Sequence, residues 1–376
     1  MKKLALLLLT GTFVFTAANA KIRRVGFFGS PVSGTDYISF ATAYTAALAG
    51  DTILMFPSTS VNGVITKKLT LIGPGNWLDP NSTPKGNANL QAFAGIATIG
   101  SLTFDAGSDG SVLSGFYGGN IYVKDDNISI LRNREIDVYI TAINPAGTIT
   151  NLQVIQNYRL SIRQQYNNSS SCTNMNISNN LIYYFNTPTG NTYSGNISNN
   201  VMAYDNTQTT NALNGGTSTY SSNYDIELGG GAYLLQNNIF VCYYNAVAAS
   251  NYNYFTFNNG GNSIFNYNMA LQTATAANWG IGVGNTTTAI TNAANIFEAF
   301  PLIGSSSSDA RYRLKAGSPA LTAGADGTPI GMFAGVTPYK LSTIPTIPTI
   351  YALSSPQGNN PPGNTIQINV STRGNN

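Results

Sequence analysis

The chain has 376 residues, and 18 Lys and Arg stand against 15 Asp and Glu. Only 9% of its residues are charged, which excludes the clustered positive charge that nucleic-acid binding requires. It has no histidine, which excludes an imidazole base and argues against most catalytic zinc sites. The hydrophobic content of 43% is enough to bury a core, so the composition is not that of a disordered protein.

Residues 1–20 read as an export signal. Lys2 and Lys3 precede an apolar stretch, and Ala18-Asn19-Ala20 has the small residues of a cleavage site, so we expect the mature chain to begin at Lys21. A transmembrane anchor is the alternative, but the segment is short for one, and no later stretch is long enough to span a bilayer. We therefore expect an extracellular, cell-surface or periplasmic protein, with net charge +1 once the two lysines are removed.

One helical pattern follows, within residues 36–50. Apolar side chains from Phe40 to Leu48 share one face, and Gly50 stands where a helix C-cap is expected. We predict a short helix here that caps a β structure. Residues 51–57 and 69–72 then read as strands, ended by Pro57 and by a Gly-Pro-Gly turn.

From residue 99 to about 270, short apolar strands recur around an asparagine. The aligned residues are Asn133, Asn157, Asn180, Asn200, Asn238 and Asn268. The first intervals are 24, 23 and 20 residues, one coil of a solenoid, and the longer ones fit coils with an insertion such as residues 203–224. The pattern predicts an all-β, right-handed parallel β-helix over residues 21–335.

Two properties of asparagine support this prediction. It tolerates the left-handed backbone of a sharp corner, and stacked asparagines form hydrogen bonds with one another along the axis of the coil. We therefore expect a structural ladder of Asn133, Asn157, Asn180, Asn200 and Asn238. The alternative is that Asn-rich loops recur in an ordinary β-sandwich.

Residues 336–376 differ in character and are predicted to form a Pro-rich strap and a terminal strand. Prolines at a three-residue repeat in residues 342–350 favour an extended conformation. Residues 366–370 alternate apolar and polar side chains, which indicates a lone strand. This strand either caps the solenoid or mediates self-assembly by adding to a neighbouring molecule. Cys172 and Cys242 either form a disulfide or are separately buried.

Three motifs carry a family resemblance. They are the entry block 40–75, the Ile-Ser-Asn-Asn coil signature, and Leu314-Lys315-Ala316-Gly317-Ser318-Pro319-Ala320 followed by Ile330-Gly331. With them the chain resembles secreted right-handed parallel β-helix proteins of the pectate-lyase-like superfamily, over residues 36–335. The superfamily includes lyases, hydrolases, epimerases and adhesins, so the resemblance implies a fold and no activity. We assign the chain to a non-catalytic or uncharacterised branch.

A polysaccharide lyase of this fold would need a Lys or Arg base. Seven charges lie within residues 124–137, and two arginines follow one period later. The candidate bases are Lys124, Arg132, Arg134, Arg159 and Arg163. Arginines could grip a uronate, and Asp125 and Asp126 are weak candidates for Ca²⁺ ligands. The alternative is a set of ion pairs on a solvated face.

Carbohydrate binding is the other possibility, and it needs exposed aromatic or carboxylate groups. Tyr252 and Tyr254 share one face of a predicted strand, and Asp225 and Glu227 form an i, i+2 pair. The same tyrosines could instead lie inside the coil. The polygalacturonase motif series is missing from this sequence.

We expect an exported protein that contacts carbohydrate or the cell envelope without catalysis. A lyase acting on a uronate glycan by β-elimination is the alternative. No cofactor is predicted beyond the weak Ca²⁺ possibility, and no nucleic-acid partner.

Overall fold

The computed structural model describes most of the chain from residue 20 onward. Residues 1–19 of the predicted signal lie outside the described residues, as do residues 366 and 367. The same holds for Cys242, Asp225, Tyr252 and Tyr254. The described residues are 20–26, 30–79, 81, 86–91, 94–141, 147–164, 170–187, 191–203, 226–228, 231–241, 262–272, 279, 281–289, 293–299, 307, 309–354 and 368–375, without the side chains of 226, 227 and 272.

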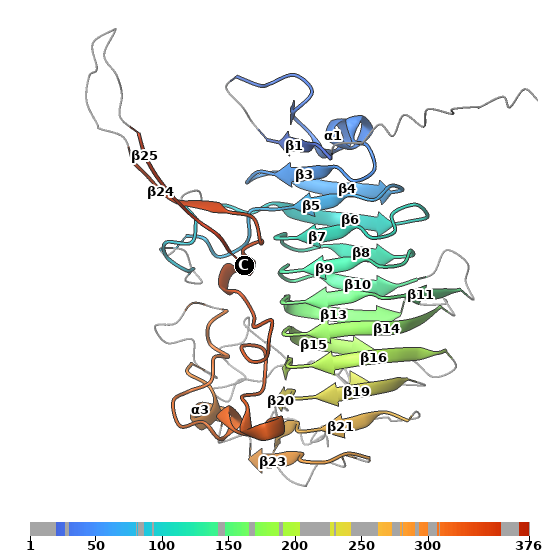
Figure 1. Cartoon of the computed structure of the whole chain (residues 1–376), viewed down its shortest axis with the longest axis vertical. Helices are drawn as coiled ribbons and strands as arrows, with labels where there is room; N and C mark the ends of the chain where they lie inside the picture. The colour runs from blue at the N-terminus through green and yellow to red at the C-terminus, as the bar shows by residue number, and fades with distance from the viewer. Residues whose placement is uncertain are drawn as a thin grey trace, which may run out of the picture.

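Two long parallel sheets wind around one another as a right-handed β-helix, which confirms the predicted fold class (Figure 1). Sheet A runs in the order β2 (Asp36–Tyr37), β1 (Ile22–Val25), β3 (Thr52–Met55), β5 (Thr70–Ile72), β7 (Val112–Ser114), β9 (Ser129–Leu131), β12 (Gln153–Ile155), β14 (Ser171–Ser178), β16 (Tyr193–Ser198), β19 (Ala232–Gln236) and β21 (Ile264–Asn266), with β11 (Thr148–Thr150) beside β14. Sheet B runs in the order β4 (Ser60–Ile65), β6 (Thr98–Phe104), β8 (Asn120–Val123), β10 (Asp137–Ile140), β13 (Tyr158–Gln164), β15 (Leu181–Asn186), β17 (Val201–Ala203), β20 (Ile239–Val241), β22 (Met269–Gln272) and β23 (Thr286–Ala289), with β18 (Ile226–Glu227) beside β15.

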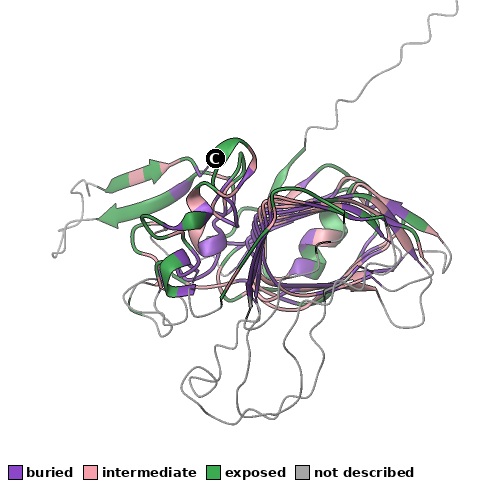
Figure 2. Ribbon diagram, turned by 90° about the horizontal axis from the view of Figure 1, so that it is seen from below, coloured by how far each residue is buried: buried purple, intermediate pink, exposed green. Residues whose placement is uncertain are grey.

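The core fills the space between the two sheets. Alternate residues of each strand point inward, so Val138, Ile162 and Phe185 are register neighbours on successive coils and have no exposed surface. An end-on view shows that the strands of the two sheets form a flattened coil in which buried residues recur along the strands (Figure 2). The outward residues of the same strands are thereby left available for other contacts.

The predicted asparagine ladder is confirmed at the corner that leads from sheet A to sheet B. Each side-chain amide donates to the Oδ1 of the next asparagine along the axis, at 2.9–3.1 Å, from Asn133 to Asn285. The same Oδ1 accepts the backbone N–H of the preceding ladder residue. Asn133, Asn157 and Asn180 have no exposed surface.

Of the two reasons given for asparagine at this corner, the hydrogen bonds along the axis are confirmed and the left-handed backbone was wrong. The left-handed residue is the one before each ladder asparagine: Arg132 (φ 54°), Gln156 (φ 60°) and Asn179 (φ 58°). The ladder asparagine is required because its amide satisfies buried backbone groups of the neighbouring coils.

A second, exposed ladder does use asparagine for its left-handed backbone. Asn127, Asn151 and Asn174 have φ between 55° and 59° and hydrogen-bond to one another in sequence. Asp109 Oδ1 accepts from the Asn127 amide at 2.7 Å. This outer ladder was not predicted.

Helix α1 (Phe40–Ala46) covers the N-terminal end of the solenoid. Ser39 caps its start, and the Lys67 ammonium binds the carbonyl oxygens of Tyr44 and Ala47 at its end. The helix is shorter than the predicted 36–50, because the chain leaves it at Ala47. Leu48, which was placed on the buried face, is 62% exposed.

The last strand of the solenoid is β23, so the solenoid ends before the predicted boundary at residue 335. Helix α3 (Ala293–Ile296) and the 3₁₀ turns η2 (Pro319–Leu321), η3 (Ala325–Gly327) and η4 (Leu341–Thr343) pack outside sheet B instead. A second apolar core joins this C-terminal module to Tyr158, Leu181, Val201 and Ile239. No helix among the described residues is long and apolar enough to cross a membrane.

The strap runs back along the ladder corner toward the N-terminal end (Figure 1). The Arg132 guanidinium donates to Ile344 O at 2.9 Å and Asn375 O at 3.0 Å, and the Gln156 amide donates to Pro338 O at 2.6 Å. The left-handed corner residues thus hold the strap. The terminal strand β25 (Asn369–Arg373) is not alone, because it pairs antiparallel with β24 (Thr349–Ser354) in a sheet separate from the two of the solenoid.

Candidate functional site

The outer face of sheet B carries a set of tyrosine, arginine and acidic side chains. Tyr122 in β8, Tyr139 in β10 and Arg163 in β13 occupy one register position on three successive coils. The residue before each of them, Ile121, Val138 or Ile162, is buried in the core, so the alternation of the strands directs these three side chains outward.

Two tyrosines of this column are stacked. The rings of Tyr122 and Tyr139 lie 4.9 Å apart at 16°, close to the spacing of neighbouring strands. On the other side of Tyr139, the Arg163 guanidinium lies 5.2 Å from the ring centroid, and it lies 5.1 Å from that of Tyr184. Cation–π contacts therefore continue the column.

Asp137 fixes the position of this arginine. Its Oδ1 accepts from Arg163 Nη2 at 2.9 Å and from the Tyr183 hydroxyl at 2.9 Å. Burial, together with the neighbouring Asp137 carboxylate, raises the pKa of Tyr183 to about 12. Burial alone would lower the pKa of Arg163, but the charge of Asp137, its hydrogen bond and the neighbouring tyrosines together raise it. Arg163 and Tyr183 are therefore both protonated at neutral pH.

Glu135 joins the other two arginines. Arg134 Nη2 lies 2.9 Å from Glu135 Oε1, and Arg159 Nη1 lies 3.6 Å from Oε2. The Arg134 guanidinium also lies 4.1 Å from the Trp77 ring and 4.8 Å from the Tyr117 ring. Arg134 and Arg159 therefore reach the same face, as the period predicted.

These two groups form one surface, because the Arg159 guanidinium lies 5.9 Å from the Tyr183 ring. We call this surface the tyrosine–arginine strip. It consists of Tyr117, Tyr122, Arg134, Glu135, Asp137, Tyr139, Arg159, Arg163, Tyr183 and Tyr184, all of them partly exposed.

Two of the proposed bases lie elsewhere. Arg132 is 6% exposed beneath the strap, and burial lowers its pKa. Lys124 follows β8, two residues after Tyr122, and its ammonium group lies 3.5 Å from the Asp105 carboxylate. It does not share an ion pair with Arg134, Arg159 or Arg163. Arg132 is thus a structural residue, whereas Lys124 lies at the edge of the strip.

Asp125 and Asp126, the weak candidates for Ca²⁺ ligands, accept hydrogen bonds within the turns of the coil. Asp125 accepts from the Ser108 hydroxyl and from the backbone N–H of Asp126, and Asp126 accepts from the Thr150 N–H at 2.6 Å. Among the described residues, no group of three or more Cys, Asp or Glu is arranged to hold a metal ion.

Most of the remaining predicted residues are not described by the structure. Asp225, Tyr252 and Tyr254 lie outside the described residues, and only the backbone of Glu227 is described, in β18 next to Asn186 of β15. Cys172 is fully buried, and burial raises its thiol pKa to about 12.

The sequence analysis missed Tyr122 and Tyr139 as site residues. They occupy the same position in residues 120–123 and 137–140, two segments that share a polar-apolar-Tyr-apolar pattern one coil apart. That shared pattern was the available signal. Tyr183 and Tyr184 are adjacent in the sequence, and alternation alone does not place them on a face, because the register of β15 is irregular there.

Comparisons with known proteins identify no family for this chain. No family model and no curated protein matches the sequence. A solved structure, titled as the crystal structure of pectate lyase Pel9A, aligns at 12% identity over 86% of this chain and 98% of that chain, with a TM-score of 0.40. Similarity at this level carries no argument about either fold or activity. The strand pairing within the chain itself makes it a right-handed parallel β-helix.

Proposed function

We propose that the protein is exported and binds a carbohydrate on the tyrosine–arginine strip without chemical change. The observation that carries this proposal is the position of Tyr122 at the end of the stacked column. One face of its ring is covered by Tyr139, while its register neighbour on the other side is the much smaller Thr103 in β6. That second ring face is therefore the place where a pyranose ring would stack.

Polar groups surround this ring face. Lys124 and Asp105 lie on the same side of sheet B as Tyr122 and Thr103, one alternation further along β8 and β6, and about a third of each side chain is exposed. Their charged groups and the Thr103 hydroxyl offer donors and acceptors for sugar hydroxyls. A flat aromatic surface with a few polar groups at its edge is typical of a binding site.

The lyase alternative is less well supported. A β-elimination needs a base that has lost its proton, and each arginine of the strip is paired with a carboxylate. For Arg163 the pairing raises the pKa, so the deprotonated form is disfavoured further. The strip is thus suited to holding a ligand.

A glycan array with the exported protein tests the proposal, followed by incubation of each bound glycan and a set of uronate polysaccharides with the protein. We expect binding to at least one glycan and no absorbance from an unsaturated product. Unsaturated product would support the lyase, and an absence of binding across neutral, acidic and amino-sugar glycans would contradict the proposal.

A further inference from the structure

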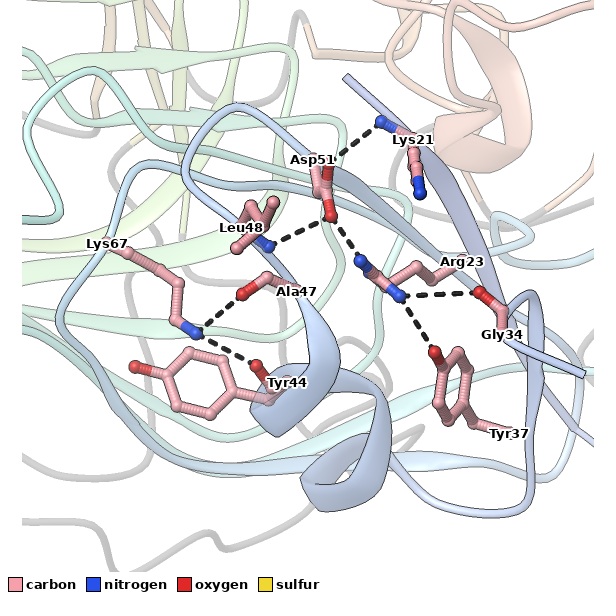
Figure 3. A network of polar contacts seen from close by, with 9 residues as sticks. All are labelled: Lys21, Arg23, Gly34, Tyr37, Tyr44, Ala47, Leu48, Asp51 and Lys67. Carbon is pink, nitrogen blue, oxygen red and sulfur yellow. Dashed lines mark hydrogen bonds and ion pairs between the residues drawn. The ribbon is translucent and has the colours of Figure 1, made fainter. Parts of the chain in front are cut away.

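Asp51 lies at the N-terminal end of the solenoid and is 2% exposed. Its Oδ2 accepts from Arg23 Nε at 2.8 Å and from the Leu48 N–H at 2.9 Å. Its Oδ1 accepts from the backbone nitrogen of Lys21 at 2.8 Å (Figure 3). Although burial alone would raise the pKa of Asp51, the hydrogen bonds from Lys21 and Leu48 and the Arg23 charge lower it, so the carboxylate is ionised at neutral pH.

Lys21 is also the residue at which the mature chain is expected to begin. Its carbonyl oxygen accepts the Thr52 N–H at 2.9 Å, and it directly precedes β1, which pairs with β3. Two contacts thus hold its backbone next to Asp51. Ala20 and Lys21 are both exposed, so the bond between them is accessible to a peptidase.

We propose that Asp51 is a docking site for the α-ammonium group that signal cleavage creates at Lys21. Hydrolysis of the Ala20–Lys21 amide by a signal peptidase consumes one water and leaves a carboxylate on Ala20 and a protonated amine on Lys21. An amide N–H donor at 2.8 Å from Asp51 Oδ1 is thereby replaced by a positive charge at the same place. Processing converts a hydrogen bond into an ion pair and fastens the N-terminal cap onto the first coils.

The Arg23 guanidinium explains why the site needs the ammonium. Arg23 is itself shared, since its Nη1 donates to the Tyr37 hydroxyl at 2.7 Å as well. Asp51 therefore has one cationic partner, Arg23, at Oδ2. At Oδ1 the partner is the nitrogen of Lys21, which is neutral as an amide and positively charged as an ammonium group. An ammonium group at Oδ1 is a second cation that stabilises the buried carboxylate charge. With the amide, Arg23 alone stabilises that charge.

The first test is the mass of the exported protein, which we expect to begin at Lys21. The inference rests on the proposed export but not on carbohydrate binding. A chain that keeps residues 1–20 would contradict both the export and the docking site. A chain that begins at another residue would contradict the docking site alone.

The second test compares the processed protein with a variant that carries one glycine inserted between Ala20 and Lys21. The insertion keeps the Lys21 N–H but moves the ammonium away from Asp51. We expect the melting temperature to fall by about 2 °C, and the same insertion to have no effect in the Asp51→Asn background. An equal fall in both backgrounds would overturn the proposal.

A third measurement covers the case in which Asp51→Asn does not fold. The α-amine pKa of the wild-type protein, followed by NMR after ¹³C-methylation of the amine, should lie above the usual value of about 8. Since the folded pKa is raised, the stabilising effect of the ammonium is present below pH 8 and is lost as the pH rises through the folded pKa. A pKa at or below the usual value would overturn the proposal.

Discussion

The side-chain amide of Asn157 donates to Asn180 Oδ1 at 3.0 Å, and the same oxygen accepts the Asn157 backbone N–H at 2.8 Å. The Asn180 amide in turn donates to Val154 O at 2.8 Å. The Asn180 amide also donates to Asn200 Oδ1 on the next coil at 3.0 Å. One side chain therefore joins two neighbouring coils, and the relationship repeats along the ladder. The inner ladder is the main polar element that holds the coils in register.

Replacing Asn180 with alanine should be strongly destabilising. The change leaves the N–H and side-chain amide of Asn157 and the carbonyl of Val154 without these partners, all in the interior, and we expect a loss of about 2–4 kcal/mol. Asn151→Ala in the exposed outer ladder is the matched control, and it should cost less than about 1 kcal/mol. Urea unfolding followed by circular dichroism measures both, and equal losses would show that the inner ladder has no special role.

Replacing Arg132 with methionine should loosen the strap. The guanidinium makes hydrogen bonds to Gln156, Ile344 and Asn375 that methionine cannot make. We expect limited proteolysis within residues 336–350 to become about tenfold faster, as the local opening free energy falls by about 1.4 kcal/mol. Lys124→Met, a change of the same kind at an exposed ion pair, should leave the cleavage rate unchanged. Equal rates in wild type and Arg132→Met would contradict the assignment.

Stability should fall at high pH, and Tyr183 should contribute to the fall. Its folded pKa is raised to about 12 by burial and by Asp137, against about 10 for an unfolded tyrosine. The folded state therefore holds the proton more tightly, and its advantage is complete below pH 10 and is lost as the pH rises to 12. Melting temperatures measured between pH 8 and 12 should decline less steeply in Tyr183→Phe. Parallel curves for the two proteins would contradict the assignment.

The Cys172 thiol should be unreactive in the native protein. It is fully buried, and its pKa is raised to about 12 by that burial, so almost no thiolate is present at neutral pH. In a Cys242→Ser variant, DTNB should label Cys172 only after denaturation. Labelling of the native variant at the rate of a free thiol would show that the coil opens at β14.

The solenoid could be predicted because the buried residues that each coil requires recur in the sequence at the period of the coil. Asn157, Asn180 and Asn200 must recur at each coil, since every coil presents the same unsatisfied groups to its neighbours. The left-handed corner could not be assigned to the correct residue, because Arg132 and Gln156 are not residues that usually take that backbone. Tertiary contacts with the strap fix them there.

The C-terminal module and the strip were harder to predict for a different reason. The second core is assembled from residues as far apart as Trp77, Tyr158 and Phe297, with no local period that links them. In the strip, the charge density of the sequence drew attention to Arg134, Arg159 and Arg163, which the structure places on one face. The outward direction of Tyr122 and Tyr139 depends on where each strand begins, which the sequence leaves open by one residue.

Self-assembly of the protein through the exposed hairpin of β24 and β25 stays a prediction. Leu353 and Val370 are about half exposed on it, so apolar surface remains available on the two strands. Deletion of residues 349–376 should leave a folded solenoid, because the hairpin forms a separate sheet. Sedimentation of wild type and deletion variant measures any assembly, and an unfolded deletion variant would contradict the separation.

The most direct test of the account is the affinity of Tyr122→Ala for a glycan that the wild-type protein binds. Tyr351→Ala, which removes a partly exposed tyrosine from the hairpin, is the matched control. Isothermal titration should show affinity reduced about tenfold for Tyr122→Ala, the loss of roughly 1.4 kcal/mol of stacking energy, and unchanged for Tyr351→Ala. Wild-type affinity in Tyr122→Ala, with its fold intact, would contradict carbohydrate binding on the tyrosine–arginine strip.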